Sequence, residues 1–263
     1  MLLILGQGYS GTFIARVARA AGYEVLGVRR QGGEGLIAFD DPALPGRIAT
    51  ASHILSSVPP DRSGEDPVLG RFGALLAGHG GWVGYLSSTG VYGDAGGAWV
   101  DEASPVGGGR RDARTAADLG WQALGATIFR LPGIYGPARC ALDQLRAGTA
   151  RRIDRPGHRF SRIHVEDIAG AVLAVAGRKA GGIFNVVDEL PAEPREVTEY
   201  ACRLSGAVLP PLLTLEAAAL PPMAQAFWTE RRCVAGLRLR RETGYRLRHP
   251  DYKAGLRAIF EGR

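Results

Sequence analysis

Lysine and cysteine are scarce in this chain. Of its 32 basic residues only Lys179 and Lys253 are lysine, so the net charge of +6 comes almost wholly from arginine. The three cysteines, Cys140, Cys202 and Cys233, are odd in number and show no CxxC spacing. This pattern excludes a disulfide framework and a zinc-ribbon site. We therefore expect a reduced, cytoplasmic setting and no metal centre.

Long hydrophobic runs are also missing. The apolar run Leu2–Leu5 is broken by Gly6, and no basic segment precedes it. We therefore expect neither a signal peptide nor a membrane span. No helix-turn-helix, zinc-finger or aromatic-interleaved basic motif accompanies the arginines. Because guanidinium groups bind carboxylates and phosphates in a bidentate way, the charge indicates an anionic cofactor and small-molecule substrate, with no nucleic-acid partner.

Glycine is abundant, with 38 residues, and three of them form Gly6-x-Gly8-x-x-Gly11 between the apolar run and an apolar-periodic helix. In such a strand–turn–helix unit the first glycine permits a tight turn and the second admits a pyrophosphate. The third lets the helix pack on the strand. Thr12 stands where a phosphate-binding loop of ATPases would need lysine, which argues against that class. The loop residues expected at a dinucleotide are Gly6, Gln7, Gly8, Tyr9, Ser10 and Gly11.

The next predicted strand, 23–28, ends at Arg29 and Arg30. An acidic residue at this place would bind the ribose 2′-hydroxyl of NAD, whereas arginine accommodates the 2′-phosphate of NADP. We therefore expect NADP as the cofactor, with NAD still possible. Asp40 follows the third predicted strand, 36–39, where its carboxylate would either bind the adenine amino group or cap a turn.

Strands alternate with helices through the first two-thirds of the chain. Further strands are predicted at 51–58, 82–86, 126–131 and 182–187, and helices at 68–77, 110–124 and 168–176. This alternation predicts an α/β fold, a doubly wound parallel sheet of the Rossmann type. Ligands of such sheets bind beyond the carboxyl ends of the strands, so the cofactor should also contact Ser56, Ser57, Val58, Leu131 and Gly133.

Several motifs together resemble the extended short-chain dehydrogenases/reductases, the family of NAD(P)-dependent sugar-nucleotide epimerases and dehydratases. Besides the glycine loop they are the segments 87–93 (SSTGVYG), 101–105 (DEASP), 130–137 (RLPGIYGP) and 163–167 (IHVED). The resemblance extends over nearly the whole chain. The family usually spaces its glycines GxxGxxG, so this chain is similar to an atypical branch.

Ser88 matches the family's serine or threonine that hydrogen-bonds the reacting oxygen, where charge develops during hydride transfer. The family's tyrosine acid/base and the lysine four residues later have no match. Alignment from Asp118 puts Arg110 at the tyrosine position and Arg114 at the lysine position. An arginine cannot exchange protons near neutral pH, so the departure changes the mechanism that the resemblance implies.

Three accounts remain open. In the first account the chain is an atypical oxidoreductase or epimerase/dehydratase, and the proton is handled by Tyr92, Tyr135 or the substrate itself. Alternatively, Arg110 and Arg114 hold an anion for a redox step that needs no tyrosine, such as reduction of an activated double bond. In the third account the chain binds NADP(H) as a sensor or scaffold without turnover. We expect an enzyme with Ser88, Tyr92, Arg110 and Arg114 as its catalytic group.

The resemblance also implies a small, mainly C-terminal substrate-binding cap. We expect a nucleotide domain from residues 1–133 and 163–187 and a cap from 134–162 and 188–263. Tyr135, Arg151, Arg152 and Arg162 lie where the family contacts its nucleotide-diphosphate substrate, although a solvated basic face would explain the arginines too. The helices 68–78 and 110–124 match the family's dimer interface, so a homodimer is expected.

Overall fold

The computed structural model describes residues 1–109 and 111–262. The helices are α1 (Tyr9–Ala20), α2 (Leu44–Thr50), α3 (Pro67–Ala77), α4 (Asp112–Ala123), α5 (Ala141–Arg146), α6 (Val165–Ala176), α7 (Pro194–Ser205), α8 (Pro222–Gln225), α9 (Leu237–Thr243) and α10 (Tyr252–Glu261), with 3₁₀ turns η1 (Thr89–Tyr92) and η2 (Ala226–Trp228). The strands are β1 (Leu2–Leu5), β2 (Val25–Arg29), β3 (Gln31–Gly33), β4 (Leu36–Ala38), β5 (His53–Ser56), β6 (Trp82–Ser88), β7 (Trp99–Val100), β8 (Thr127–Leu131), β9 (Gly133–Tyr135), β10 (Arg152–Ile153), β11 (Arg162–His164), β12 (Ile183–Asn185), β13 (Leu212–Leu213) and β14 (Cys233–Val234).

A large sheet with the strand order β12-β8-β6-β5-β1-β2-β4-β3 forms the centre of the fold. Its strands pair in parallel, apart from the short edge strand β3, which runs antiparallel to β4. From β1 the chain builds outward through β2 and β4, and then returns to the other side of β1 with β5. The strand order therefore reverses between β1 and β5, which is where such sheets bind ligands. The predicted doubly wound Rossmann fold is confirmed.

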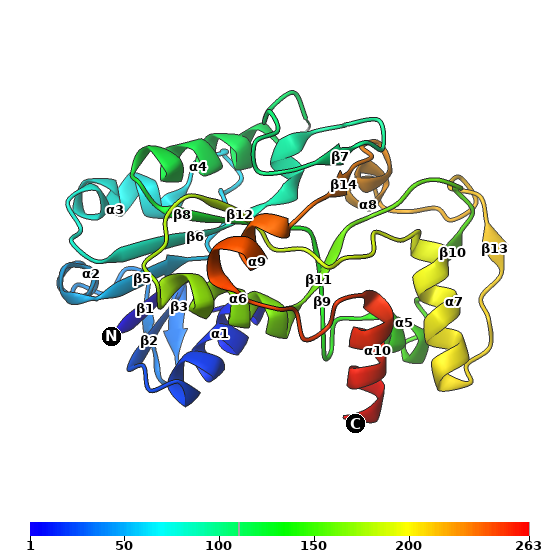
Figure 1. Cartoon of the computed structure of the whole chain (residues 1–263), viewed down its shortest axis with the longest axis horizontal. Coiled ribbons are helices and arrows are strands. Elements are labelled where there is room, and N and C mark those ends of the chain that lie inside the picture. The colour runs from blue at the N-terminus through cyan, green and yellow to red at the C-terminus, as the bar shows by residue number, and fades with distance from the viewer. Residues whose placement is uncertain (110, 263) are drawn as a thin grey trace.

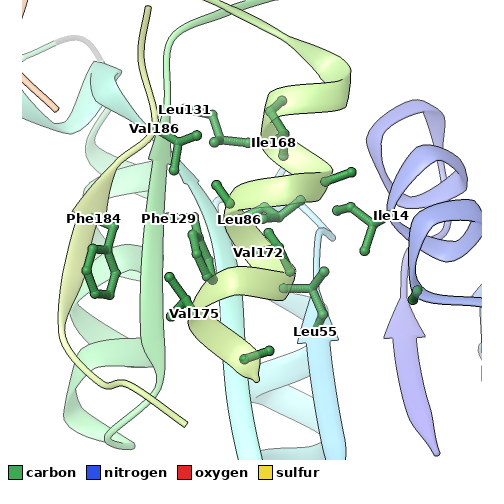
Figure 2. Close-up of a cluster of buried hydrophobic side chains, with 14 of the residues drawn as sticks. Ile14, Leu55, Leu86, Phe129, Leu131, Ile168, Val172, Val175, Phe184 and Val186 are labelled. Atoms are coloured by element: carbon green, nitrogen blue, oxygen red, sulfur yellow. The ribbon is translucent and has the colours of Figure 1, made fainter. Parts of the chain in front are cut away.

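Helices cover both faces of this sheet (Figure 1). On one face α1 and α6 pack together, and Figure 2 shows Ile168, Val172 and Val175 of α6 directed at the side chains of β5, β6 and β8. The spacing i, i+4, i+7 places these three residues on one side of the helix. On the other face Trp121 of α4 is fully buried and stacks on Tyr85 of β6, with ring centroids 5.1 Å apart.

Short elements differ from the sequence prediction. β3 and α2 were not expected, because three and seven residues are too few to show a clear hydrophobic period. The helix predicted from 110 is described from Asp112, and Arg110 lies outside the described residues. The sequence predicts no strand after 182–187, but the C-terminal part of the chain also contributes β13 and β14.

A second body of smaller elements, α5, α7, α10, β10 and β13, stands beside the sheet (Figure 1). It has its own core, which includes Leu142, Ala201 and Leu256. The segment 233–243 returns to the nucleotide-binding half, since β14 pairs with β7 and α9 packs on β12 and α6. The division into a nucleotide domain and a cap stays a prediction, and so does the homodimer through α3 and α4. In the described part of the chain, no helix combines the length and apolar character that crossing a membrane requires.

A buried ion pair joins α4 to the sheet below the carboxyl ends of β6 and β8. Arg130 contacts both carboxylate oxygens of Asp118, at 2.9 and 3.2 Å, and both side chains are almost inaccessible to solvent. Arg130 also donates to the Tyr92 hydroxyl at 3.0 Å, which in turn donates to Asn185 Oδ1 at 2.7 Å. Ser87 donates to the same carboxylate of Asp118. One network therefore fixes α4, β6, β8, η1 and β12 relative to one another.

We expect Asp118→Ala to lower the free energy of unfolding by about 3–5 kcal/mol, because it leaves the guanidinium of Arg130 buried without a counter-charge. The exposed pair Arg238–Glu242, with atoms 2.6 Å apart, supplies a matched control. Glu242→Ala should cost less than about 1 kcal/mol. Urea unfolding of both variants checks this, and losses of equal size would contradict the role given to the buried pair.

Candidate functional site

The glycine loop lies at the point where the strand order reverses. Gly6 has a φ of +84°, and a Cβ there would lie 2.8 Å from Cγ2 of Val58. A Cβ at Gly11 would press on Ile4 at 3.3 Å, so this glycine lets α1 pack on β1. Gly8 is exposed, and a Cβ there would meet only the Gly6 carbonyl oxygen, at 3.9 Å. The three glycines thus have the turn, access and packing properties that a dinucleotide loop requires.

Residues between the glycines differ in what they offer to a ligand. Gln7 is buried, its backbone N–H donates to Val28, and its side chain occupies the space that a side chain at Gly27 would fill. Gln7 therefore supports the loop from inside. Tyr9 and Ser10 are half-buried in the first turn of α1, which has neither a side-chain cap nor an acidic residue. The N–H groups of this turn face the loop opening, where they suit an anion.

The end of β5 forms the opposite wall of the loop. Ser57 donates from its hydroxyl to the Gly6 carbonyl, and Val58 contacts the loop beside Gly6. Ser56 is fully buried and its hydroxyl accepts from the Val58 N–H, so its side chain does not reach a ligand. Of the three residues expected here, Ser57 and Val58 have side chains at the loop.

The expected adenosine end is formed by exposed residues. Arg29 and Arg30 are both exposed at the end of β2, and Arg29 Nε donates to the Gln7 carbonyl at 2.8 Å. This bond holds the arginine against the glycine loop. Asp40 is exposed beyond β4, while the neighbouring Asp41 accepts from the Ala43 N–H and starts the next turn. Asp40 is therefore the member of the acidic pair whose side chain stays available at this edge.

A cavity of about 1060 Å³ extends from the carboxyl ends of β6 and β8 toward the smaller body. Its near end is formed by Ser88, Leu131 and Gly133, which brings the expected oxyanion serine and two expected cofactor residues together. Its far walls come from α5, α7 and α10 of the smaller body. Described residues at its surface include six arginines and two acids, so the cavity carries a positive charge: Arg111, Arg114, Arg139, Arg151, Arg162, Arg232, Asp143 and Glu230.

The structure places Arg111, which sequence reasoning overlooked, beside Ser88. The Ser88 hydroxyl accepts from the Gly90 N–H at 3.1 Å. Both Ser88 Oγ and Arg111 Nε lie 3.2 Å from the point that a Cβ on Gly90 would occupy, and Arg111 Cδ lies only 2.6 Å from it. Gly90 therefore makes room for the arginine next to the serine. The sequence prediction named Arg110, which lies outside the described residues, so its assigned role stays a prediction.

Arg114 also lines the cavity, from the first turns of α4. Its NH1 lies 3.4 Å from the Tyr85 hydroxyl, its guanidinium faces the Tyr85 ring, and its Nε has no hydrogen-bond partner among the described residues. A buried guanidinium nitrogen without a partner is costly, which favours an acceptor supplied by a ligand. The arrangement is compatible with the ribose or anion role predicted for Arg114.

The two tyrosines considered as proton donors are held in place by the protein itself. Tyr92 does not line the cavity: it is 5% exposed, and its hydroxyl is engaged by Arg130 and Asn185. Burial raises its pKa. Tyr135 lines the cavity, but its hydroxyl donates to the Asp251 carbonyl at 3.2 Å, and burial raises its pKa as well. The geometry therefore gives no support to Tyr92 as a proton donor and little to Tyr135.

The arginines expected at the substrate are spread apart. Arg151 and Arg162 line the cavity, whereas Arg152 points to the Pro210 carbonyl and to Glu199, 3.0 Å from each. Arg151 donates to the Ala218 carbonyl, and Arg162 donates to the carbonyls of Phe160 and Ala192 at 2.8 and 2.9 Å. These contacts show that the three guanidinium groups also hold cap backbone in place.

The cavity holds one cysteine, Cys140, whose Sγ lies 3.0 Å from a carboxylate oxygen of Asp143. Burial and this carboxylate raise the pKa of the thiol, so it stays protonated near neutral pH.

Behind Arg162, Asp188 is 2% exposed, and neither of its carboxylate oxygens has a hydrogen-bond partner among the described residues. Burial raises its pKa to about 8. No pattern in the sequence marked Asp188, which follows β12, as a residue of the site.

Comparison with known proteins gives the chain a family. No protein-family model matches it. A conserved protein of unknown function from Silicibacter pomeroyi is 39% identical, with a TM-score of 0.89 over 99% of this chain and 98% of that protein. Identity at this level over the full length shows that the two proteins belong to one family.

More distant structures share the fold. The human epimerase family protein SDR39U1, solved with NADPH, is 19% identical with a TM-score of 0.78 and full coverage of both chains. The dTDP-glucose 4,6-dehydratase of Bacillus anthracis, solved with NAD, is 13% identical with a TM-score of 0.76, over 99% of this chain and 95% of that one. The fold is thus that of the extended short-chain dehydrogenases/reductases, as the resemblance predicted.

One curated relative adds a reaction class. The 3-diazoavenalumate denitrifying reductase from a Streptomyces species is 32% identical over 146 residues, which are 51% of this chain. The chain matches about half the length of that relative, 46%.

The loop geometry makes a testable prediction about Gly6. Gly22 has nearly the same φ, +85° against +84°, but a Cβ at Gly22 would meet nothing within 4 Å. Both Gly→Ala changes should cost about 1–2 kcal/mol of backbone strain. Gly6→Ala should cost about 1–3 kcal/mol more, because its methyl group collides with Val58. Urea unfolding measures both losses, and equal values for the two variants would contradict the close approach.

Proposed function

We propose that this member of the Silicibacter protein's family is an NADP(H)-dependent reductase. It would act on an anionic small molecule without the tyrosine–lysine pair of the extended short-chain dehydrogenases/reductases. The observation that carries the proposal is the cavity next to the glycine loop, where Arg111 is a neighbour of Ser88 and the two tyrosines considered as proton donors are engaged by the protein itself.

The cofactor fits the residues present. The exposed Gly8, the uncapped first turn of α1 and the wall formed by Ser57 and Val58 together suit a pyrophosphate. Arg29 and Arg30 suit a 2′-phosphate, and SDR39U1, which has the same fold, was solved with NADPH. A nicotinamide dinucleotide bound here would supply hydride at the end of the cavity marked by Ser88, Leu131 and Gly133.

Reduction fits the site better than alcohol oxidation. Oxidation of an alcohol needs a group that takes the hydroxyl proton, as epimerases and dehydratases of this fold require. Tyr92 lies outside the cavity, and Cys140 stays protonated. Reduction of a carbon–carbon double bond conjugated to a carboxylate adds hydride to carbon and moves the electron pair toward oxygen. Ser88 and the arginines would stabilise that charge, and a proton from solvent would complete the product.

The charge of the cavity supports an anionic substrate. Glu230 is paired with Arg232 at 3.0 Å, and Asp143 lies 4.0 Å from Arg146, so the two acids offer little to a cationic ligand. The remaining arginines leave a positive surplus in a partly desolvated space, which attracts carboxylates and phosphates. The Streptomyces relative is itself called a reductase, which agrees with the reaction class proposed here.

The first prediction of this proposal concerns cofactor choice. Arg29→Asp and Arg30→Asp should each weaken NADPH binding by about tenfold or more, because a charge-assisted contact to phosphate becomes a repulsion. NADH binding should change by less than about threefold. Arg241→Asp, at an exposed position of α9, serves as the control. Fluorescence titration with both dinucleotides gives the affinities, and equal weakening of NADH would contradict the 2′-phosphate assignment.

The second prediction concerns turnover. Metabolites that co-purify with the protein can be identified by mass spectrometry and tested, together with unsaturated carboxylates, for NADPH oxidation. Ser88→Ala should lower kcat by about 10²-fold, as removal of an oxyanion donor does, while leaving NADPH affinity unchanged. Ser63→Ala, in an exposed loop, is the control. NADPH binding without oxidation in any of these mixtures would instead favour a sensor or scaffold.

A further inference from the structure

Three aromatic side chains of the cap line one wall of the cavity. They are Phe160, which precedes β11, and Phe227 and Trp228 of η2. Trp228 and Phe160 meet edge to face with centroids 5.6 Å apart. The ring of His158 packs against both, at 5.1 and 4.8 Å. We call Phe160, Phe227 and Trp228 the aromatic wall.

The uncharged imidazole ring of His158 packs against the aromatic wall. His158 is 1% exposed, and neither ring nitrogen has a hydrogen-bond partner among the described residues. Burial lowers the pKa of this imidazole, so it remains neutral at physiological pH. The neutral imidazole packs in a tilted arrangement against Trp228. The wall is therefore an apolar surface set in an otherwise basic cavity.

Phe227 connects this wall to the reactive end. Its side chain is 45% exposed at the cavity, and the guanidinium carbon of Arg111 lies 5.1 Å from its ring centroid. Arg111 in turn shares the space at Gly90 with Ser88. Arg111 thus links Phe227 of the aromatic wall to the space beside Ser88. An exposed phenyl ring beside a cation suits a ligand that covers the ring and also carries a negative charge.

The positions where the fold's nucleotide-sugar enzymes would hold a diphosphate are less suitable here. Arg151 donates to a backbone carbonyl, and Arg152 lies outside the cavity and pairs with Glu199. Neither guanidinium is free for two phosphates without giving up these contacts. The features that remain at the cavity surface fit one carboxylate and one flat ring.

We propose that the part of the cavity between Ser88 and the aromatic wall binds an aromatic carboxylate. Arg111 holds the carboxylate, and Phe227 and Trp228 cover the ring. This rests on the proposed reductase function and names its substrate class. The cavity, at about 1060 Å³, has room for such a molecule beside a nicotinamide, since ligand pockets commonly measure about 300–1000 Å³.

Two acids of equal charge and chain length test the ring. Protein saturated with NADP⁺, which cannot donate hydride, is titrated calorimetrically with 3-phenylpropanoate and with 3-cyclohexylpropanoate. The phenyl acid should bind about threefold to tenfold more tightly, the range expected from aromatic stacking. Phe227→Leu should bring the two affinities to within about twofold of each other. Equal affinities in the wild-type protein would overturn the proposal.

Arg111→Gln should weaken the binding of both propanoates by about tenfold or more and by the same factor, because it removes the guanidinium charge and leaves the aromatic wall intact. Two exposed residues outside the cavity supply controls: Phe260→Leu and Arg240→Gln should change neither affinity. UDP-glucose binding that is tighter than that of the phenyl acid, or unaffected by Arg111→Gln, would identify a nucleotide-sugar cleft and overturn the proposal.

The two proposals fail in different ways. If NADP⁺ binds and neither acid binds at millimolar concentration, the substrate class is wrong and the reductase proposal stands. If NADP⁺ itself does not bind, the cofactor assignment is wrong. The same titrations with the free protein then still decide whether the wall prefers an aromatic ring.

Discussion

The buried pair of Arg130 and Asp118 is the constraint on which the rest of this structure depends. Two charges removed from water must satisfy each other, and here the pair also bonds Ser87, Gln122 and Tyr92, while Tyr92 in turn donates to Asn185. Because these partners come from α4, β6, η1, β8 and β12, the pair fixes the floor of the cavity. The register of α4 then decides which of its arginines face Ser88.

The same network accounts for the unusual chemistry of the site. Tyr92 follows Ser88 by four residues, but Arg130 and Asn185 engage its hydroxyl, so it stabilises the fold. The described part of the cavity surface carries six arginines, which remain protonated, beside the Ser88 hydroxyl, and its two acids, Asp143 and Glu230, lie against Arg146 and Arg232. Such a surface stabilises negative charge, which is the ground for proposing hydride addition to an unsaturated acid.

Local sequence signals located the cofactor loop because each glycine has a local reason. Gly6 needs a positive φ, Gly11 touches β1, and both requirements involve residues close in the chain. The same reasoning failed for Ser56, Ser57 and Val58, which look alike in sequence. Alternation along β5 buries Ser56 and directs Ser57 to the loop. β3 and α2 were missed because they are too short to show a period.

The sequence by itself determined the doubly wound sheet, the glycine loop with the arginines that follow β2, and the absence of a tyrosine–lysine pair. These features depend on hydrophobic period, on glycine geometry and on residue identity, all of which are local. Only the tertiary structure brought Arg111 beside Ser88, removed Tyr92 and Arg152 from the cavity, and set Phe227 and Trp228 against it. These placements depend on contacts between segments as far apart as η1 and η2, and no local pattern encodes such distances.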